Sequence, residues 1–189
     1  MQCDPCDCGA IDWTARPSVF PRGLGPVHAA TNVPLLLYSA MFCPVTAASF
    51  PNISFITSQY FRQGGEHGVI STPAPGSSLA FYNTIMAAYA ATGIMGAFEI
   101  DYMDFLLLAF DEFAADLTSA AQWADGFAAA ALAYGQSVQL CMTLPAFVLA
   151  SVQWPAVTSA RGTEDNVPTN DDRWQIAYAS MLFAALDLR

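Results

Sequence analysis

The sequence predicts an α/β fold, a partial (β/α)8 barrel of the TIM type with about six β-α units in the chain. Short apolar runs alternate with stretches of helical pattern along the chain, as in repeated β-α units. Uncharged tracts such as 23–61 and 126–160 suit strands that are buried on both faces of a parallel sheet. Because a whole barrel needs about 250 residues, we expect the 189 residues to form one incomplete barrel domain, 1–189.

The first half of the chain is expected to hold three strands and one long helix. One strand is expected at the extreme N-terminus, and the apolar runs 34–42 and 53–59 predict two more. The segment 71–78 has the composition of a turn and ends in residues that cap helices. A packed helix is therefore expected over 79–92, and Gly93 ends it.

The second half continues the alternation with three strands and two helices. Strands are expected over 98–103, 138–143 and 156–160. Between the first two, Thr118 or Ser119 is expected to cap a helix that ends at Gly135. A last helix is expected over 173–188, after acidic residues that suit the positive end of a helix.

Composition excludes several classes of partner and cofactor. The chain has 16 Asp and Glu against 6 Arg and no Lys, so a nucleic acid is not expected to bind. Prolines interrupt the uncharged tracts, so contact with a membrane is possible but not favoured. Cys3, Cys6 and Cys8 lie close together, but no second pair or histidine cluster completes a four-ligand set, so no metal is expected. No phosphate-binding glycine motif occurs, and no cofactor is implied. The compartment is left open.

Two acidic positions follow predicted strands, where the reactive groups of a β/α barrel lie. Asp101 ends the strand 98–103, and Asp165 follows the strand 156–160. Hydrolysis of a glycosidic bond needs two carboxyl groups, one ionised and one protonated, and Arg161 could hold one of them ionised. The structural alternative stays open, because acids at strand ends also cap helices and Glu99 could pair with an arginine inside the barrel.

Three segments together resemble a known family. The run 12–24 resembles the segment after the first strand of α-galactosidase-like glycoside hydrolases, with an acidic residue before a Phe-Pro-x-Gly-Leu turn. The run 98–102 resembles their fourth-strand motif, and 160–165 is similar to their sixth-strand Arg-x-Ser-x-Asp pattern. The segments 138–145, 151–158 and 173–176 also resemble uncharacterised eukaryotic glycosidase-like barrel proteins, so the resemblance covers nearly the whole chain.

The resemblance implies a retaining glycoside hydrolase that acts on α-glycosides and binds a carbohydrate. It makes Asp101 the nucleophile, Asp165 the general acid/base and Arg161 an orienting or charged group of the site. Asp4 matches the first-strand aspartate that binds sugar hydroxyls. From their side chains alone, Tyr102 and Trp154 are the aromatic residues expected to face the sugar.

Departures from the family pattern support an alternative function. Asp4 is followed by Pro-Cys-Asp-Cys instead of tryptophans, Ala146 stands where the family has a basic residue or histidine, and Thr163 replaces the serine. No seventh or eighth unit follows in this sequence. The alternative is a catalytically inactive, truncated barrel that serves as a structural or interaction subunit of a larger, possibly membrane-associated assembly. Partner proteins would then cover its open edges.

Overall fold

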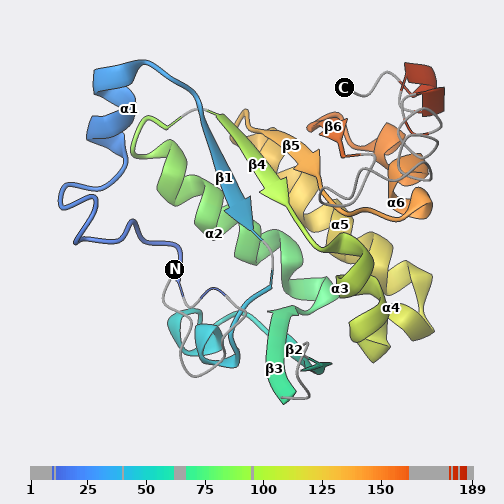
Figure 1. Cartoon of the computed structure of the whole chain (residues 1–189). Coiled ribbons are helices and arrows are strands. Elements are labelled where there is room, and N and C mark those ends of the chain that lie inside the picture. Colours follow the sequence, from blue (N-terminus) through green and yellow to red (C-terminus); the bar gives the residue numbers. More distant parts are fainter. Residues whose placement is uncertain are drawn as a thin grey trace.

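The chain forms a mixed α/β structure with two separate sheets (Figure 1). The computed structural model describes residues 10, 12–39, 41–61, 67–94, 96–161, 179, 181, 182 and 184–186. The larger sheet has four parallel strands and the smaller has two antiparallel strands. The α/β class is thus confirmed for the described residues.

The parallel sheet is built from the apolar runs that predicted it. In sheet order, its strands are β1 (Leu35–Ser39), β4 (Gly96–Ile100), β5 (Ser137–Leu140) and β6 (Val157–Ala160). The order follows the chain without reversal, so each strand lies beside the preceding parallel strand. All four strands lie within or close to their predicted ranges, and β1, β4 and β5 each end three residues earlier than expected.

Two long helices cover one face of this sheet (Figure 1). They are α2 (Ser78–Ala90), close to the predicted range, and α5 (Leu117–Ala133). The expected cap of α5 was wrong: Asp116 is the N-cap, and its carboxylate accepts hydrogen bonds from the Thr118 N–H and the Ser119 hydroxyl, each at 2.9 Å. Gly135 follows the helix with a φ of 64°, as its predicted stop.

Shorter elements link the strands and the long helices. The α-helices are α1 (Gly25–Thr31), α3 (Met103–Ala109), α4 (Asp111–Ala115) and α6 (Pro145–Ala150). Three 3-10 helices accompany them: η1 (Pro44–Ser49), η2 (Pro75–Ser77) and η3 (Ser151–Gln153). Among the described residues, no helix combines the length and the apolar composition that a membrane crossing requires.

The smaller sheet corrects one prediction. The run 53–59 was expected to be a strand of its own β-α unit, but β2 (Phe55–Phe61) pairs with β3 (His67–Pro73) in an antiparallel hairpin. Only the residues 62–66 separate the two strands. A parallel crossover needs about a dozen residues or more, so a connection this short permits only an antiparallel return.

Both ends of the chain fall largely outside this description. The strand expected at the extreme N-terminus falls before Ala10, the first described residue. Ala10 itself forms a parallel bridge to Phe42. Residues 1–9 lie outside the described residues. The expected helix 173–188 also lies largely outside them, although 179, 181–182 and 184–185 are helical.

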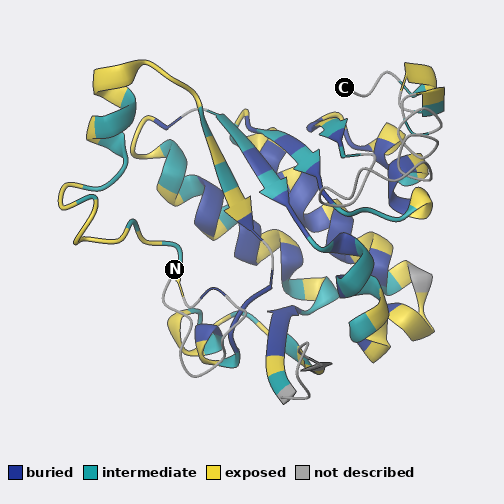
Figure 2. Ribbon diagram, in the orientation of Figure 1, coloured by how far each residue is buried: buried dark blue, intermediate teal, exposed yellow. Residues whose placement is uncertain are grey.

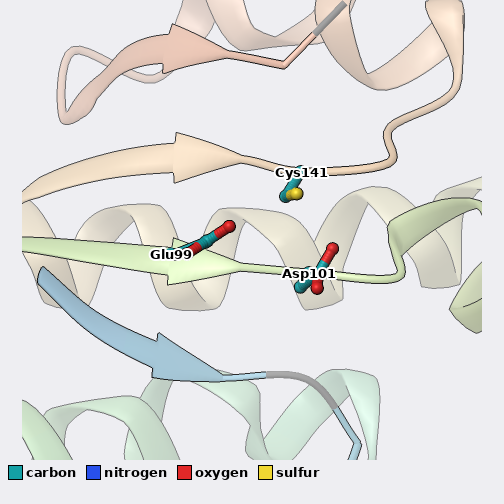
Figure 3. Close-up of side chains that lie close together, drawn as sticks. All are labelled: Glu99, Asp101 and Cys141. Carbon is teal, nitrogen blue, oxygen red and sulfur yellow. The ribbon is translucent and has the colours of Figure 1, made fainter. Parts of the chain in front are cut away.

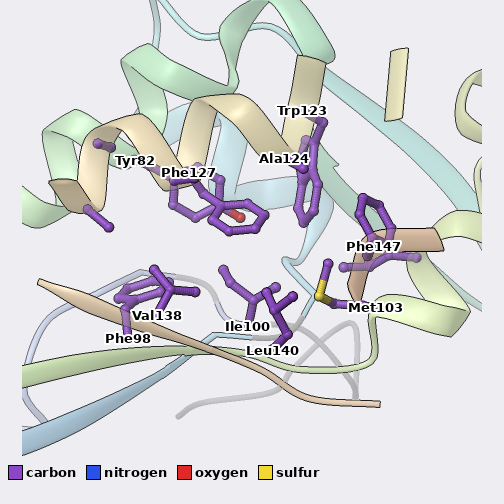
Figure 4. Packing of buried hydrophobic residues seen from close by; sticks show 14 of the residues in the cluster. Tyr82, Phe98, Ile100, Met103, Trp123, Ala124, Phe127, Val138, Leu140 and Phe147 are labelled. Atoms are coloured by element: carbon purple, nitrogen blue, oxygen red, sulfur yellow. The ribbon is translucent and has the colours of Figure 1, made fainter. Parts of the chain in front are cut away.

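The main core lies between the parallel sheet and the two long helices (Figures 2 and 4). Alternate side chains of the central strands point into it, namely Phe98, Ile100, Val138 and Leu140. Helix α5 contributes Trp123 and Phe127, and α2 contributes Tyr82. Each of these large side chains stabilises the fold by about 1.5–3 kcal/mol on burial. The side chains between them on the same strands must therefore point to the opposite face.

Candidate active site

The face of the sheet opposite α2 and α5 carries a row of polar side chains. Strand register aligns Tyr38 of β1 with Glu99 of β4, Gln139 of β5 and Ser159 of β6. Because their neighbours Phe98 and Val138 point into the core, this row points away from the long helices. A polar row on one face of a mostly apolar sheet is unusual in a chain of which 54% is hydrophobic.

A second row follows directly after the strands end. Backbone bonds continue the ladder, since the Asp101 N–H donates to the Ser39 carbonyl and the Arg161 N–H donates to the Leu140 carbonyl, each at 2.8 Å. Cys141 lies between them, and its N–H donates to the Ile100 carbonyl. Asp101, Cys141 and Arg161 thus stand side by side at the carboxyl ends of three neighbouring strands.

Each oxygen of the Asp101 carboxylate accepts a hydrogen bond. The Tyr38 hydroxyl donates to Oδ2 at 2.7 Å, and the backbone N–H of Tyr102 donates to Oδ1 at 2.8 Å. The Asp101 side chain is only 8% exposed. One donor on the neighbouring strand β1 and one on the residue that follows Asp101 therefore fix both the position and the rotation of this carboxylate.

The Tyr38 hydroxyl is held in its protonated form. Burial raises the pKa of Tyr38 well above its ordinary value, and the hydrogen bond to Asp101 and the negative charges of Asp101 and Glu99 raise it further. Ionisation would place a phenolate against a carboxylate in a partly buried position. Tyr38 consequently remains a hydrogen-bond donor to Asp101 at neutral pH.

Glu99 and Cys141 complete a compact group around Asp101 (Figure 3). One oxygen of Glu99, one oxygen of Asp101 and the Cys141 Sγ all lie within 4.8 Å of one another. Burial raises the pKa of the Cys141 thiol strongly, and its hydrogen bonds to Asp101 and Glu99 raise it further, while Arg161 opposes the shift. The thiol is therefore a proton donor between two carboxylates. A cation that bound all three groups would first have to displace this proton.

Backbone strain accompanies the strand ends. Tyr102 has φ 54° and ψ 36°, and Met142 has φ 47°, although neither is a glycine. Such left-handed conformations cost about 1–3 kcal/mol each and persist where the surroundings fix them. Here Asp101 Oδ1 fixes Tyr102, and the Asp104 N–H donates to the Met142 carbonyl at 2.8 Å. The two strained residues directly follow Asp101 and Cys141.

The structure brings together some of the predicted residues. Asp101, Tyr102 and Arg161 lie at the carboxyl end of the sheet. Trp154 lies before β6, hence toward the opposite end, where it is 6% exposed and packs against Phe127 and Phe147. Its indole N–H donates to Asp125 at 2.6 Å. Trp154 therefore does not lie beside Asp101, and the predicted residues Asp4 and Asp165 lie outside the described residues.

Three residues of the group, namely Tyr38, Glu99 and Cys141, were not among the predicted site residues. Tyr38 lies in a predicted strand, but only the register of β1 against β4 places its hydroxyl on Asp101. Cys141 directly follows β5, as Asp101 directly follows β4. This shared position at a strand end is the feature of the sequence that could have predicted Cys141 as a site residue.

No family model, curated protein or solved structure matches this chain. The resemblance drawn from the sequence thus gains no support from relatives.

Proposed function

We propose that the chain is a retaining glycoside hydrolase that acts on α-glycosides, with Asp101 as the nucleophile. The observation that carries this proposal is the Asp101 carboxylate, which is nearly buried at the end of a central strand and held on both oxygens. A carboxylate that attacks an anomeric carbon must be oriented before the substrate arrives, and these two donors orient it.

The proposed reaction has two steps, with Asp165 as the acid/base. In the first, an Asp101 oxygen forms an ester bond to the anomeric carbon while the glycosidic C–O bond breaks and Asp165 gives its proton to the leaving oxygen. In the second, Asp165 takes a proton from water, and the hydroxide oxygen replaces Asp101 at the same carbon. The enzyme returns to its starting protonation, and the configuration of the sugar is retained.

The remaining site residues have supporting roles in this proposal. Tyr38 keeps its hydroxyl proton and steadies Asp101 through both steps. Arg161 places positive charge in the row of Asp101, and Asp4 and Tyr102 bind the sugar. The fold inferred with this function is a partial (β/α)8 barrel. Its support is a parallel sheet in chain order with both long helices on one face, as in consecutive units of a barrel.

A second candidate is an inactive barrel fragment that binds protein partners through its open edges. The observation that favours it is the exposure of large apolar side chains, with Leu149 54% and Val152 59% exposed near β6 and Leu36 49% exposed on the edge strand β1. Partner chains that covered these surfaces would remove them from water.

The two candidates are separated by a test of turnover. We expect the protein to hydrolyse a p-nitrophenyl α-glycoside and Asp101→Asn to lower kcat by at least about 10³-fold, because the nucleophile is lost. Asp111→Asn changes an exposed carboxylate on α4 and is the matched control, which keeps full activity. Proton NMR of the first-formed sugar should show retained configuration. Full activity of Asp101→Asn, or an inverted product, would contradict the mechanism.

A further inference from the structure

One asparagine of the chain stands in the acceptor sequence for N-linked glycosylation. Asn52, Ile53 and Ser54 form an Asn-x-Ser triplet whose middle residue is not proline. Neither serine nor threonine stands two positions after any of the other asparagines, Asn32, Asn83, Asn166 and Asn170. The sequence therefore offers a single acceptor for an N-linked glycan, and the structure shows how that acceptor is presented.

The acceptor asparagine lies at the tip of a β-turn. The turn runs from Phe50 to Ile53, and the Ile53 N–H donates to the Phe50 carbonyl at 3.0 Å. Pro51 at the second position fixes the φ that such a turn needs, and Asn52 occupies the third position. Both turn residues, Pro51 and Asn52, are exposed. A bulky group on Asn52 therefore has solvent to extend into.

The residues on either side hold this turn at the surface. The Phe50 ring packs edge-on against the buried Phe81 ring, with 4.8 Å between the ring centroids. On the other side, the Ser54 N–H donates to the Ser77 hydroxyl at 3.2 Å. These contacts use an aromatic ring and a backbone group, and both Asn52 and Ser54 are exposed. The fold thus fixes the turn and leaves the two residues that define the acceptor at the surface.

A disulfide independently indicates the compartment in which the protein folds. Cys43 directly precedes η1, is 1% exposed, and is disulfide-bonded to a partner outside the described residues. Disulfides form and persist in oxidising compartments such as the lumen of the endoplasmic reticulum, and they are rare in the cytosol. Asn-x-Ser acceptors are glycosylated in the surface loops of secreted proteins. The disulfide and the exposed acceptor therefore indicate the same compartment.

We propose that Asn52 carries an N-linked oligosaccharide that is attached in the oxidising lumen of the secretory pathway. The donor is an oligosaccharide held on a lipid diphosphate. The Asn52 side-chain nitrogen forms a bond to the anomeric carbon of this oligosaccharide, while the bond from that carbon to the diphosphate oxygen breaks. The amide nitrogen loses one proton, the lipid diphosphate leaves, and nothing is oxidised or reduced. The proposal is independent of the activity proposed for Asp101.

A glycan at Asn52 restricts where a partner chain can bind. The turn connects η1 to β2, and Figure 1 shows both of these elements at the end of the molecule below the parallel sheet. Val45 of η1 is 44% exposed at this end. A bulky, hydrated oligosaccharide beside it keeps the end in contact with water. The partners of an interaction subunit would then have to bind elsewhere, for example beside Leu149 and Val152 of α6 and η3.

The first arm of the test expresses the whole chain behind a cleavable secretion signal in a eukaryotic cell line. Peptide N-glycosidase F removes N-linked glycans, so it should increase the electrophoretic mobility of the unaltered protein. Asn52→Gln and Ser54→Ala should migrate at this faster position without the enzyme, whereas Ser54→Thr keeps the acceptor triplet and should behave as the unaltered protein. Asn83→Gln changes an asparagine outside any acceptor triplet and is the matched control, which should keep the shift. An unaltered protein that the enzyme does not shift, or a shift that persists in Asn52→Gln, would overturn the proposal.

The second arm uses the protein isolated from its own cells. Release of the glycan by the same enzyme converts the Asn52 side chain to a carboxylate, which mass spectrometry of the peptide detects. Alkylation in denaturant without a reductant should label the free thiol of Cys141 and leave Cys43 unlabelled until the disulfide is reduced. An Asn52 peptide without a glycan overturns the proposal. Labelling of Cys43 without a reductant also overturns it, because the protein would then not have folded in an oxidising compartment.

Discussion

The Asp101 carboxylate has one donor on each oxygen, and the two donors differ in how they can be removed. The Tyr102 donor is a backbone N–H, and no substitution removes it without also changing the backbone conformation there. The Tyr38 donor is a hydroxyl on another strand and can be deleted alone. The pair thus allows the orientation of Asp101 to be tested without changing Asp101 itself.

Tyr38→Phe should lower kcat/KM for an aryl α-glycoside by about 10- to 100-fold. The loss arises because Asp101 Oδ2 keeps its position poorly once the 2.7 Å bond is gone. Steady-state kinetics measure the change, and urea unfolding should show a loss of only about 1 kcal/mol. Tyr134→Phe, a similar change at the end of α5, is the control. Kinetics of Tyr38→Phe equal to those of the control would contradict the role of Tyr38.

The Cys141 thiol makes the free energy of unfolding depend on pH in the alkaline range. Its pKa is raised in the folded protein, so the folded state keeps the thiol proton at pH values where the unfolded thiol, with a pKa of about 8.5, has lost it. The stabilisation is therefore complete below about pH 8.5 and declines as pH rises toward the folded pKa, by at most about 1.4 kcal/mol per pH unit.

This dependence can be measured by urea unfolding between pH 7 and pH 10. We expect the unfolding free energy of the unaltered protein to fall more steeply above pH 8.5 than that of Cys141→Ala. At neutral pH the substitution itself lowers stability, because Cys141 is 1% exposed and fills part of the site. Parallel pH curves for the two proteins would show that Cys141 does not carry the effect.

At the scale of elements, the approach of α2 to α5 depends on one glycine. A Cβ added at Gly126 of α5 would lie 2.5 Å from the Ser78 hydroxyl and 2.6 Å from the Leu79 nitrogen. The Ser78 hydroxyl also donates to the Trp123 carbonyl at 2.6 Å, so the two helices are fixed at this point. No side chain fits there without moving one helix away from the other.

Gly126→Ala should therefore destabilise the protein by about 2 kcal/mol or more, although alanine by itself favours a helix by about 1 kcal/mol over glycine. Gly76→Ala is the matched control, because nothing lies within 4 Å of its added Cβ. Thermal and urea unfolding of both variants measure the difference. A Gly126→Ala variant as stable as the control would mean that the helices separate at no cost.

The elements that the sequence predicted well are those with strong local patterns. Apolar runs predicted β1, β4, β5 and β6, and a turn followed by an apolar stretch predicted α2. Burial of a strand or a helix requires apolar residues in that segment itself, so the sequence shows it directly. The β2–β3 hairpin was missed because no strand was expected over 67–73, whose last residues were assigned to a turn over 71–78. The run 53–59 was therefore left without its antiparallel partner.

The candidate site was predictable only in part, for a related reason. Asp101 could be placed at a strand end from local pattern alone. Its contacts with Tyr38 and Cys141 depend on the register between strands that are far apart in the chain, and no local pattern encodes that register. The position of Trp154 was equally unpredictable from local pattern, because a tryptophan suits both a sugar site and a core. In the structure Trp154 lies before β6 and is part of the core.

For the whole molecule, charge and apolar exposure act against each other. The chain carries a net charge of −10 at pH 7, and this repulsion keeps copies apart in solution. Exposed side chains such as Leu108, at 73%, and the edge of β1 that has no partner strand among the described residues favour association once the repulsion is removed. The balance should shift near the isoelectric point of about 4.2.

We therefore expect association to rise as pH falls from 7 toward 4.2 and to rise at pH 7 when salt is increased from 0.05 to about 0.5 M, which shortens the Debye length to less than half. Light scattering and sedimentation velocity at several protein concentrations measure both trends. Stable assemblies at pH 7 in low salt and at low concentration would contradict the expectation, since attraction would then exceed a charge of −10. That result would favour the interaction subunit over the enzyme, because its surfaces would be matched to a partner rather than merely left uncovered.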